Sequence, residues 1–178
     1  MWHFFPMSQA FQASRAFHAS KVITAAQLAG ERARPEAAGQ RLVFTNGCFD
    51  LLHVGHVRYL QAARALGDAL VVAVNGDDSV RALKGPTRPI NREEDRAEVL
   101  AALGCVDYVV IFPEVRVTSL VREVRPHIYA KGGDYTPESL DPGERAALEE
   151  TGTEIRILGL VPGRSTTQML ASAASKAQ

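Results

Sequence analysis

The sequence predicts an α/β protein with a doubly wound, five-stranded parallel sheet. Five short runs rich in Val, Ile and Leu alternate along the chain with segments of helical periodicity. The apolar runs show no strict alternation with polar residues, as is typical of strands buried on both faces. Polar, glycine-bearing segments follow four of the five runs, which is where ligand-binding loops lie in such a sheet.

The expected elements follow one another in a regular order. A helix is expected over residues 21–34, and a cluster of helix breakers at 35–39 ends it. Strands are then expected at residues 42–45, 70–74, 108–112, 128–130 and 155–158. Further helices are expected at residues 57–66, 93–103, 118–125 and 144–151, with a last one from about residue 166. This alternation is typical of right-handed crossovers between parallel strands.

Composition limits the classes of protein that remain. The chain has 178 residues, of which 46% are hydrophobic, and its 20 basic and 20 acidic side chains give zero net charge. Zero charge argues against a surface that binds nucleic acid, and no apolar run is long enough for membrane insertion. Two cysteines are too few for a disulfide framework, so we expect buried thiols and a cytoplasmic location. Residues 21–178 suit a single domain.

The first 20 residues form an extension with a different composition. They contain Trp2 and four of the seven phenylalanines, and no acidic residue precedes Glu31. Phe4, Met7 and Phe11 recur at helical spacing, which predicts a short helix that docks on the body or on a second subunit. A mobile tail is the alternative.

The segment with the most specific chemistry is His-x-Gly-His at residues 53–56, where the first strand's loop enters a long helix. Imidazoles at that place lie near the positive end of the helix dipole and beside unpaired amides, which favour anions. Gly55 lets a phosphate approach the backbone, and His53 and His56 supply donors that stabilise charge on phosphorus. A helix cap with two incidental histidines is the alternative, and two histidines without further ligands make a metal site a weak interpretation.

A family resemblance rests on this segment and on several others. Thr-Asn-Gly-Cys-Phe-Asp-Leu-Leu-His-x-Gly-His, residues 45–56, resembles the signature of the cytidylyltransferase-like nucleotidyltransferases, which have a Rossmann-like fold. Further segments are similar to the adenylyltransferase domain that makes ADP-heptose from heptose 1-phosphate: residues 73–80, 83–85, 88–91, 96–100, 131–135 and 165–167. The resemblance covers residues 21–172 and keeps the order of these motifs. It implies transfer of an adenylyl group from ATP to a heptose 1-phosphate, as in lipopolysaccharide core biosynthesis.

The resemblance also implies roles for individual residues. The catalytic residues would be His53, His56 and Lys84. The nucleotide would be bound by Thr45, Asn46, Phe49, Gly55, Arg96, Lys131, Gly132, Asp134, Ser165, Thr166 and Thr167. The sugar phosphate would be bound by Asp50, Asn75, Asp77 and Arg88.

Ordinary structural roles compete with these assignments. Lys84, on a glycine-containing loop, is also explained as a hydrated surface lysine, and Arg96 as a helical ion pair. Ser165 to Thr167 also suit an N-cap, and aspartates at turns often cap the backbone.

The same resemblance implies the partners of the reaction. Mg²⁺ is expected with ATP, held by phosphates and water, and the sequence shows no carboxylate cage that would name its ligands. Some members carry a sugar kinase ahead of this domain, so we expect a separate kinase here, and we expect a homodimer. Two alternatives stay open. One is a cytidylyltransferase that acts on glycerol 3-phosphate or a related alcohol phosphate, and the other is a nucleotide-binding module without turnover.

Overall fold

The computed structural model describes residues 21–33, 37–133, 136 and 139–159. It contains one parallel sheet with the strand order β3-β2-β1-β4-β5. The strands are β1 (Leu42–Gly47), β2 (Ala69–Asn75), β3 (Tyr108–Phe112), β4 (Ile128–Gly132) and β5 (Glu154–Leu158). The predicted fold class, an α/β doubly wound five-stranded parallel sheet, is therefore confirmed.

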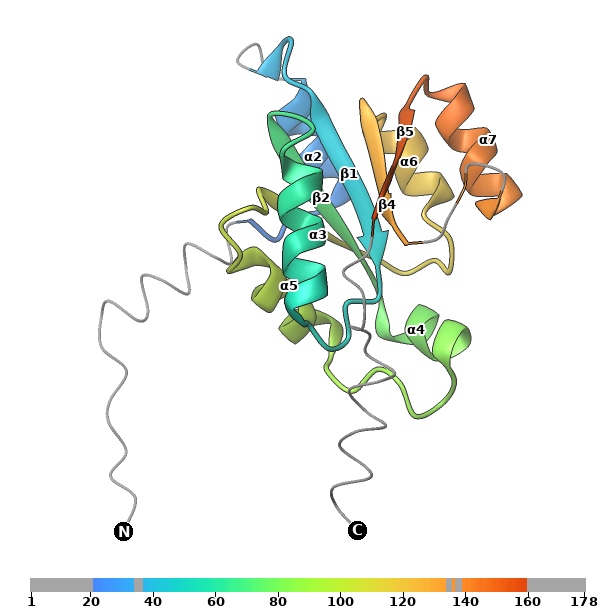
Figure 1. Ribbon diagram of the computed structural model, residues 1–178. Helices are drawn as coiled ribbons and strands as arrows, with labels where there is room; N and C mark the ends of the chain where they lie inside the picture. The colour runs from blue at the N-terminus through green and yellow to red at the C-terminus, as the bar shows by residue number, and fades with distance from the viewer. Residues whose placement is uncertain (1–20, 34–36, 134–135, 137–138, 160–178) are drawn as a thin grey trace, which may run out of the picture.

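Helices cover both faces of this sheet (Figure 1). One face carries α3 (Val54–Arg64) and α5 (Glu93–Ala101), and the other carries α2 (Ala25–Arg32), α6 (Thr118–Val124) and α7 (Pro142–Glu150). Successive side chains of a strand enter opposite cores: Val43 packs among the α3 and α5 side chains, and Phe44 among those of α2, α6 and α7. Burial on both faces explains why the strands read as continuous apolar runs.

Several element boundaries differ from the sequence prediction. Residues 21–23 do not begin a helix, because Ile23 N donates to Val109 O and Val109 N donates to Lys21 O, as in an added edge strand. The helix starts only after Thr24, whose hydroxyl accepts from Gln27 N in a capping box. α3 starts three residues before the predicted position, since His53 caps it.

The fold contains one helix that the sequence did not predict. α4 (Asp77–Lys84) follows β2 directly and lies beyond the carboxyl ends of the strands (Figure 1). The Asn-Gly-Asp-Asp segment that we interpreted as a loop is the start of this helix. Lys84 is therefore its last residue and not a loop residue.

Candidate active site

The predicted site lies where the direction of strand connection reverses. From β1 the chain continues outward through β2 and β3, whereas β4 returns to the other side of β1. In sheets of this type the crevice at the carboxyl ends of these two central strands is the usual ligand site. Asn46 at the end of β1 and Lys131 at the end of β4 meet there, with Nζ of Lys131 3.4 Å from Oδ1 of Asn46.

Tyr129 joins these two residues across the crevice. Its hydroxyl donates to Asn46 Oδ1 at 2.7 Å, and Lys131 Nζ donates to the Tyr129 hydroxyl at 3.1 Å. Burial lowers the pKa of Lys131 below its usual value, and the Glu144 carboxylate partly offsets this effect. The result is a largely desolvated amine at the edge where a phosphate-bearing ligand is expected.

The two histidines of the His-x-Gly-His segment lie together at the start of α3. His53 is the N-cap, and its Nδ1 accepts the Gly55 N–H at 3.1 Å. That bond assigns the proton of the neutral His53 ring to Nε2. The rings of His53 and His56 stack with their centroids 4.0 Å apart. Gly55 is buried in the first turn, so both imidazoles stand at the positive end of the helix dipole.

His56 is held in its uncharged form. Burial is the main cause that lowers its pKa to about 4, and the neighbouring His53 contributes to the same shift. The Phe49 ring meets the His56 ring edge-on at 5.5 Å, and Phe49 adopts a left-handed backbone conformation at φ 46°. Nδ1 of His56 is a buried polar atom for which the structure shows no hydrogen-bond partner. A buried imidazole of this kind is suited to a ligand that supplies the missing partner.

Lys84, Arg88 and Arg96 lie near enough to the loop between β1 and α3 for their charges to act on Cys48. Burial raises the pKa of the Cys48 thiol in this loop, whereas the positive charges of Lys84, Arg96 and Arg88 lower it. Their charges therefore reach the carboxyl edge of β1. Cys48 itself is only partly buried, in contrast to the expected buried thiol.

Asp50 and Arg88, which are predicted to bind the sugar phosphate, bind each other in the structure. Asp50 is almost fully buried, and its carboxylate accepts from Arg88 Nε at 2.5 Å, Ile90 N at 2.8 Å and Asn91 N at 3.0 Å. Groups of the protein itself therefore supply the hydrogen bonds that the Asp50 carboxylate accepts. Asp50 thus lies inside the protein, and its ion pair with Arg88 orients the Arg88 guanidinium.

Arg96 is likewise committed to partners within the protein. Its buried guanidinium donates to Asp77 Oδ1 at 2.8 Å, to Cys48 O at 2.6 Å and to Asn91 O at 3.0 Å. Arg96 and Asp77 therefore have structural partners, and their predicted roles in nucleotide and sugar-phosphate binding stay predictions. Asn75 is also buried, with Nδ2 donating to Glu114 O at 3.3 Å.

Thr45 faces the interior and not the crevice. It is fully buried, and its hydroxyl lies 2.7 Å from the hydroxyl of Tyr59, which donates to Ala130 O at 2.9 Å. Burial raises the pKa of Tyr59 to about 12. Gly132 adjoins the same ring, because a Cβ placed on it would be 2.9 Å from Tyr59. The Thr45 hydroxyl is thus engaged inside the protein, and the nucleotide-binding role of Thr45 stays a prediction.

Four predicted nucleotide-binding residues lie outside the described residues: Asp134, Ser165, Thr166 and Thr167. The extension 1–20 and the helix expected from residue 166 also lie outside them. In contrast, sequence reasoning missed Tyr59, Asn91 and Glu93. Tyr59 follows His56 by three residues and thus shares its helix face, which was a usable signal. Asn91 belongs to the segment 88–91 that carries the family resemblance, but no role was assigned to it, and no sequence pattern indicated Glu93.

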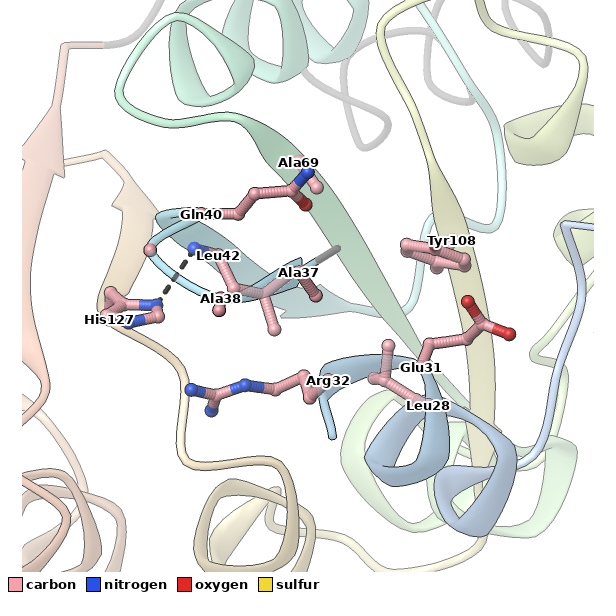
Figure 2. Close-up of a pocket in the computed structure, with 11 residues that line it drawn as sticks. Leu28, Glu31, Arg32, Ala37, Ala38, Gln40, Leu42, Ala69, Tyr108 and His127 are labelled. Carbon is pink, nitrogen blue, oxygen red and sulfur yellow. Dashed lines mark hydrogen bonds between the residues drawn. The ribbon is translucent and has the colours of Figure 1, made fainter. Parts of the chain in front are cut away.

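A cavity of about 170 Å³ lies at the opposite, amino-terminal edge of the sheet (Figure 2). Leu28 and Arg32 of α2, Leu42 of β1 and His127 before β4 line it, and His127 Nδ1 accepts the Leu42 N–H at 3.0 Å. None of the predicted site residues contributes to its walls. We therefore assign the chemistry to the carboxyl edge, where the histidines and lysines gather.

Two features are absent from the described residues. These residues contain no group of three or more His, Cys, Asp or Glu side chains arranged to hold a metal ion. Within the same part of the chain, no helix has both the length and the apolar character needed to cross a membrane.

Comparison with solved structures supports the fold. The lipopolysaccharide core biosynthesis protein from Thermoplasma volcanium is 32% identical, with a TM-score of 0.57 over 69% of this chain and 98% of that one. Pantoate-beta-alanine ligase from Francisella tularensis shares the fold at 12% identity, with a TM-score of 0.50 over 86% of this chain and 76% of that one.

Comparison with sequences identifies the family. The bifunctional protein HldE of Pelobacter propionicus is 54% identical over 76% of this chain, and that of Geobacter sulfurreducens is 50% identical over 80%. The chain spans 27% and 29% of the lengths of these relatives. The model of the family described as cytidylyltransferase-like matches residues 44–161, which include the histidine pair and all five strands except the first two residues of β1. The chain belongs to the cytidylyltransferase-like family.

Proposed function

We propose that this protein transfers the adenylyl group of ATP to a heptose 1-phosphate and produces ADP-heptose and pyrophosphate. The observation that carries the proposal is the stacked His53–His56 pair at the N-terminus of α3, beside the crevice between β1 and β4. Family membership supports nucleotidyl transfer. Similarity to HldE proteins and to a lipopolysaccharide core biosynthesis protein supports the heptose substrate.

The chemistry requires positioning more than a reactive side chain. An oxygen of the sugar phosphate attacks the α-phosphorus of ATP, a new P–O bond forms, and the bond to the β-phosphate oxygen breaks. Pyrophosphate leaves with the bonding electron pair, and no covalent intermediate with the protein is needed. The chain must therefore align two phosphates and stabilise the charge that gathers on their oxygens.

His56 is the group best placed to stabilise that charge. Its pKa of about 4 makes it a neutral imidazole at pH 7 in the ligand-free protein. A neutral ring donates one hydrogen bond, and negative charge beside it favours further protonation as the reaction proceeds. His53, with its proton on Nε2, supplies a second donor next to it.

Two lysines supply the positive charge. We assign Lys84 to the contact between the substrate phosphate and the α-phosphate, because it ends α4 near the β1–α3 loop. We assign Lys131 to the nucleotide, because its desolvated amine lies at the crevice between β1 and β4. Low surrounding polarity strengthens the attraction of such an amine for phosphate.

The remaining components follow from the proposed reaction. The described residues hold no carboxylate cage, so a magnesium ion would be held by the triphosphate and water, and no residue is assigned to it. A sugar kinase would take part in supplying the sugar phosphate, and a cytoplasmic location would supply ATP. We also propose a homodimer.

The test is a panel of substrates for the full chain. Pyrophosphate release is measured with ATP, CTP or GTP, each combined with heptose 1-phosphate or glycerol 3-phosphate. The proposal predicts release with ATP and heptose 1-phosphate. Turnover only with CTP and glycerol 3-phosphate would replace it with the cytidylyltransferase alternative. Nucleotide binding without turnover on any pair would indicate a binding module.

A further inference from the structure

The helix that carries Lys84 has little connection to the hydrophobic core. Only Ser79 and Val80 of its eight residues are buried, and neither belongs to the two core clusters on the faces of the sheet. α4 lies apart from the two helical layers (Figure 1). Apolar packing alone therefore does not fix where Lys84 stands relative to the histidines.

Polar contacts from Asp50 hold the connection that follows α4. The carboxylate accepts from Ile90 N, Asn91 N and the Arg88 guanidinium, and the side chain is 2% exposed. In return, Nδ2 of Asn91 donates to the backbone oxygen of Asp50 at 2.6 Å. Asp50 precedes His53 by three residues, so this set of bonds joins the histidine loop to residues 88–91.

Arg96 makes a second connection between the same parts of the molecule. Its guanidinium, 1% exposed, reaches Asp77 at the start of α4, Asn91 after its end, and Cys48 in the histidine loop. Glu93, three residues before Arg96, accepts the Asp77 N–H at 2.6 Å. Both ends of the α4 segment are thus tied to α5 and to the loop of residues 48–50.

We propose that Asp50 and Arg96 are positioning residues that fix the place of Lys84 relative to the histidine loop without touching the substrate. This inference rests on the proposed function for the role of Lys84. Charged groups this deeply buried destabilise the folded state unless they are paired. Here the pairs join the loop of residues 48–50, the start of α4 and the residues 88–91. Catalytic groups must be held to within about an ångström of their productive positions, and such pairing around the site provides that rigidity.

The kinetic test uses one substitution that keeps the side-chain shape, Asp50→Asn, and one that keeps the charge, Arg96→Lys. In Asp50→Asn and Arg96→Lys we expect kcat to fall about 10- to 100-fold, as small displacements of reacting groups do. We expect the Kd for ATP, measured without the sugar phosphate, to change less than threefold. Asp78→Asn breaks an exposed ion pair with Arg81 on α4, and Arg122→Lys an exposed pair with Glu150 on α6. Both controls should keep the wild-type kcat.

A double variant separates positioning from general damage. If Asp50 acts through Lys84, then Lys84→Ala combined with Asp50→Asn should be no slower than Lys84→Ala alone, because the group to be positioned is already gone. Losses that multiply in the double variant would overturn the inference.

Hydrogen exchange of the free protein tests the anchoring independently of any substrate. We expect the amides of residues 77–92 to exchange at least tenfold faster in Asp50→Asn and Arg96→Lys, while those of β1 and α3 stay unchanged. Asn91→Ala removes one bond from an exposed side chain and gives a milder variant for the same measurement should the others fail to fold. Unchanged exchange in residues 77–92 would overturn the inference even in an active enzyme. Wild-type protein that is inactive on every substrate pair would instead refute the proposed function.

Discussion

At the scale of single residues, the environment of His56 determines the protonation state of its imidazole. A solvated histidine is partly charged near neutral pH, whereas burial and the stacked His53 hold His56 uncharged. The buried Nδ1, for which the structure shows no partner, leaves the ring one hydrogen bond short. The sequence indicated both histidines from their spacing, but only the folded chain shows that their rings stack and that the Phe49 ring meets His56 edge-on.

Replacement of His56 tests its contribution to the transition state. We expect His56→Ala to lower kcat by about a hundredfold or more, as the loss of a donor to a developing oxyanion does. The measurement is steady-state pyrophosphate release. Circular dichroism should show an unchanged fold, and an unchanged kcat would remove His56 from the mechanism.

The lowered pKa of His56 also predicts how stability depends on pH. The folded state favours the neutral ring, so between pH 6.5 and about 4 the unfolded chain binds more protons at this residue. The contribution of His56 to the free energy of unfolding is therefore fully present above pH 6.5 and is lost as the pH falls toward 4. We expect His56→Gln to lose less stability than wild type when urea unfolding at pH 7.5 is compared with pH 5.

The exposed His127 provides the matched control for that experiment. Its pKa is also lowered by burial and by nearby arginines, so His127→Gln should reduce the pH dependence less than His56→Gln does. Equal pH dependence in wild type and His56→Gln would show that the ring is not held neutral by the fold.

At the scale of elements, buried strands were easier to predict than polar helices. The residues of all five strands were identified within two positions at each end, because burial on both faces demands apolar side chains. α4 was missed because its buried surface is small and its first turn, Asp77 and Asp78, looks like a polar turn. Its position depends on Arg96 and Glu93, which belong to another helix, so no local pattern indicates it.

Gly132 tests the fit between β4 and α3. A Cβ there would lie 2.9 Å from the Tyr59 ring, which is fixed by hydroxyl contacts to Thr45 and Ala130. We expect Gly132→Ala to lower the free energy of unfolding by about 1–3 kcal/mol, as overpacking does. Urea unfolding measures the change.

Gly30 in α2 is the matched control, because a Cβ on it would meet nothing within 4 Å. There alanine should raise the stability by about 0.5–1 kcal/mol through its better helix propensity. A Gly132→Ala protein as stable as wild type would show that the ring moves freely.

At the scale of the whole molecule, zero net charge is compatible with a phosphate site because the charges are sorted by position. The pairing of those charges was not predictable from the sequence. Arg88 and Arg92 lie near the ligand edge but pair with Asp50 and Glu94, and Arg96 pairs with Asp77. Such pairs join residues 19 to 38 positions apart in the buried cases, and only the folded chain brings them together.

The fold class and the edge of the sheet that holds the site were predictable for one physical reason. Parallel strands bring their carboxyl ends to the same edge, so loops distant in sequence had to converge. Which side chains face the crevice was less predictable. Thr45 lies inward and Asn46 lies at the crevice, although both belong to the same motif.

Adenylyl transfer can be recognised from the fate of the phosphates of ATP. The full chain is incubated with heptose 1-phosphate and ATP that is labelled either at the α- or at the γ-phosphate. We expect the α-label in a sugar nucleotide with the mass of ADP-heptose and the γ-label only in pyrophosphate. Transfer of γ-label to the sugar, or release of α-label as AMP without a sugar nucleotide, would contradict adenylyl transfer.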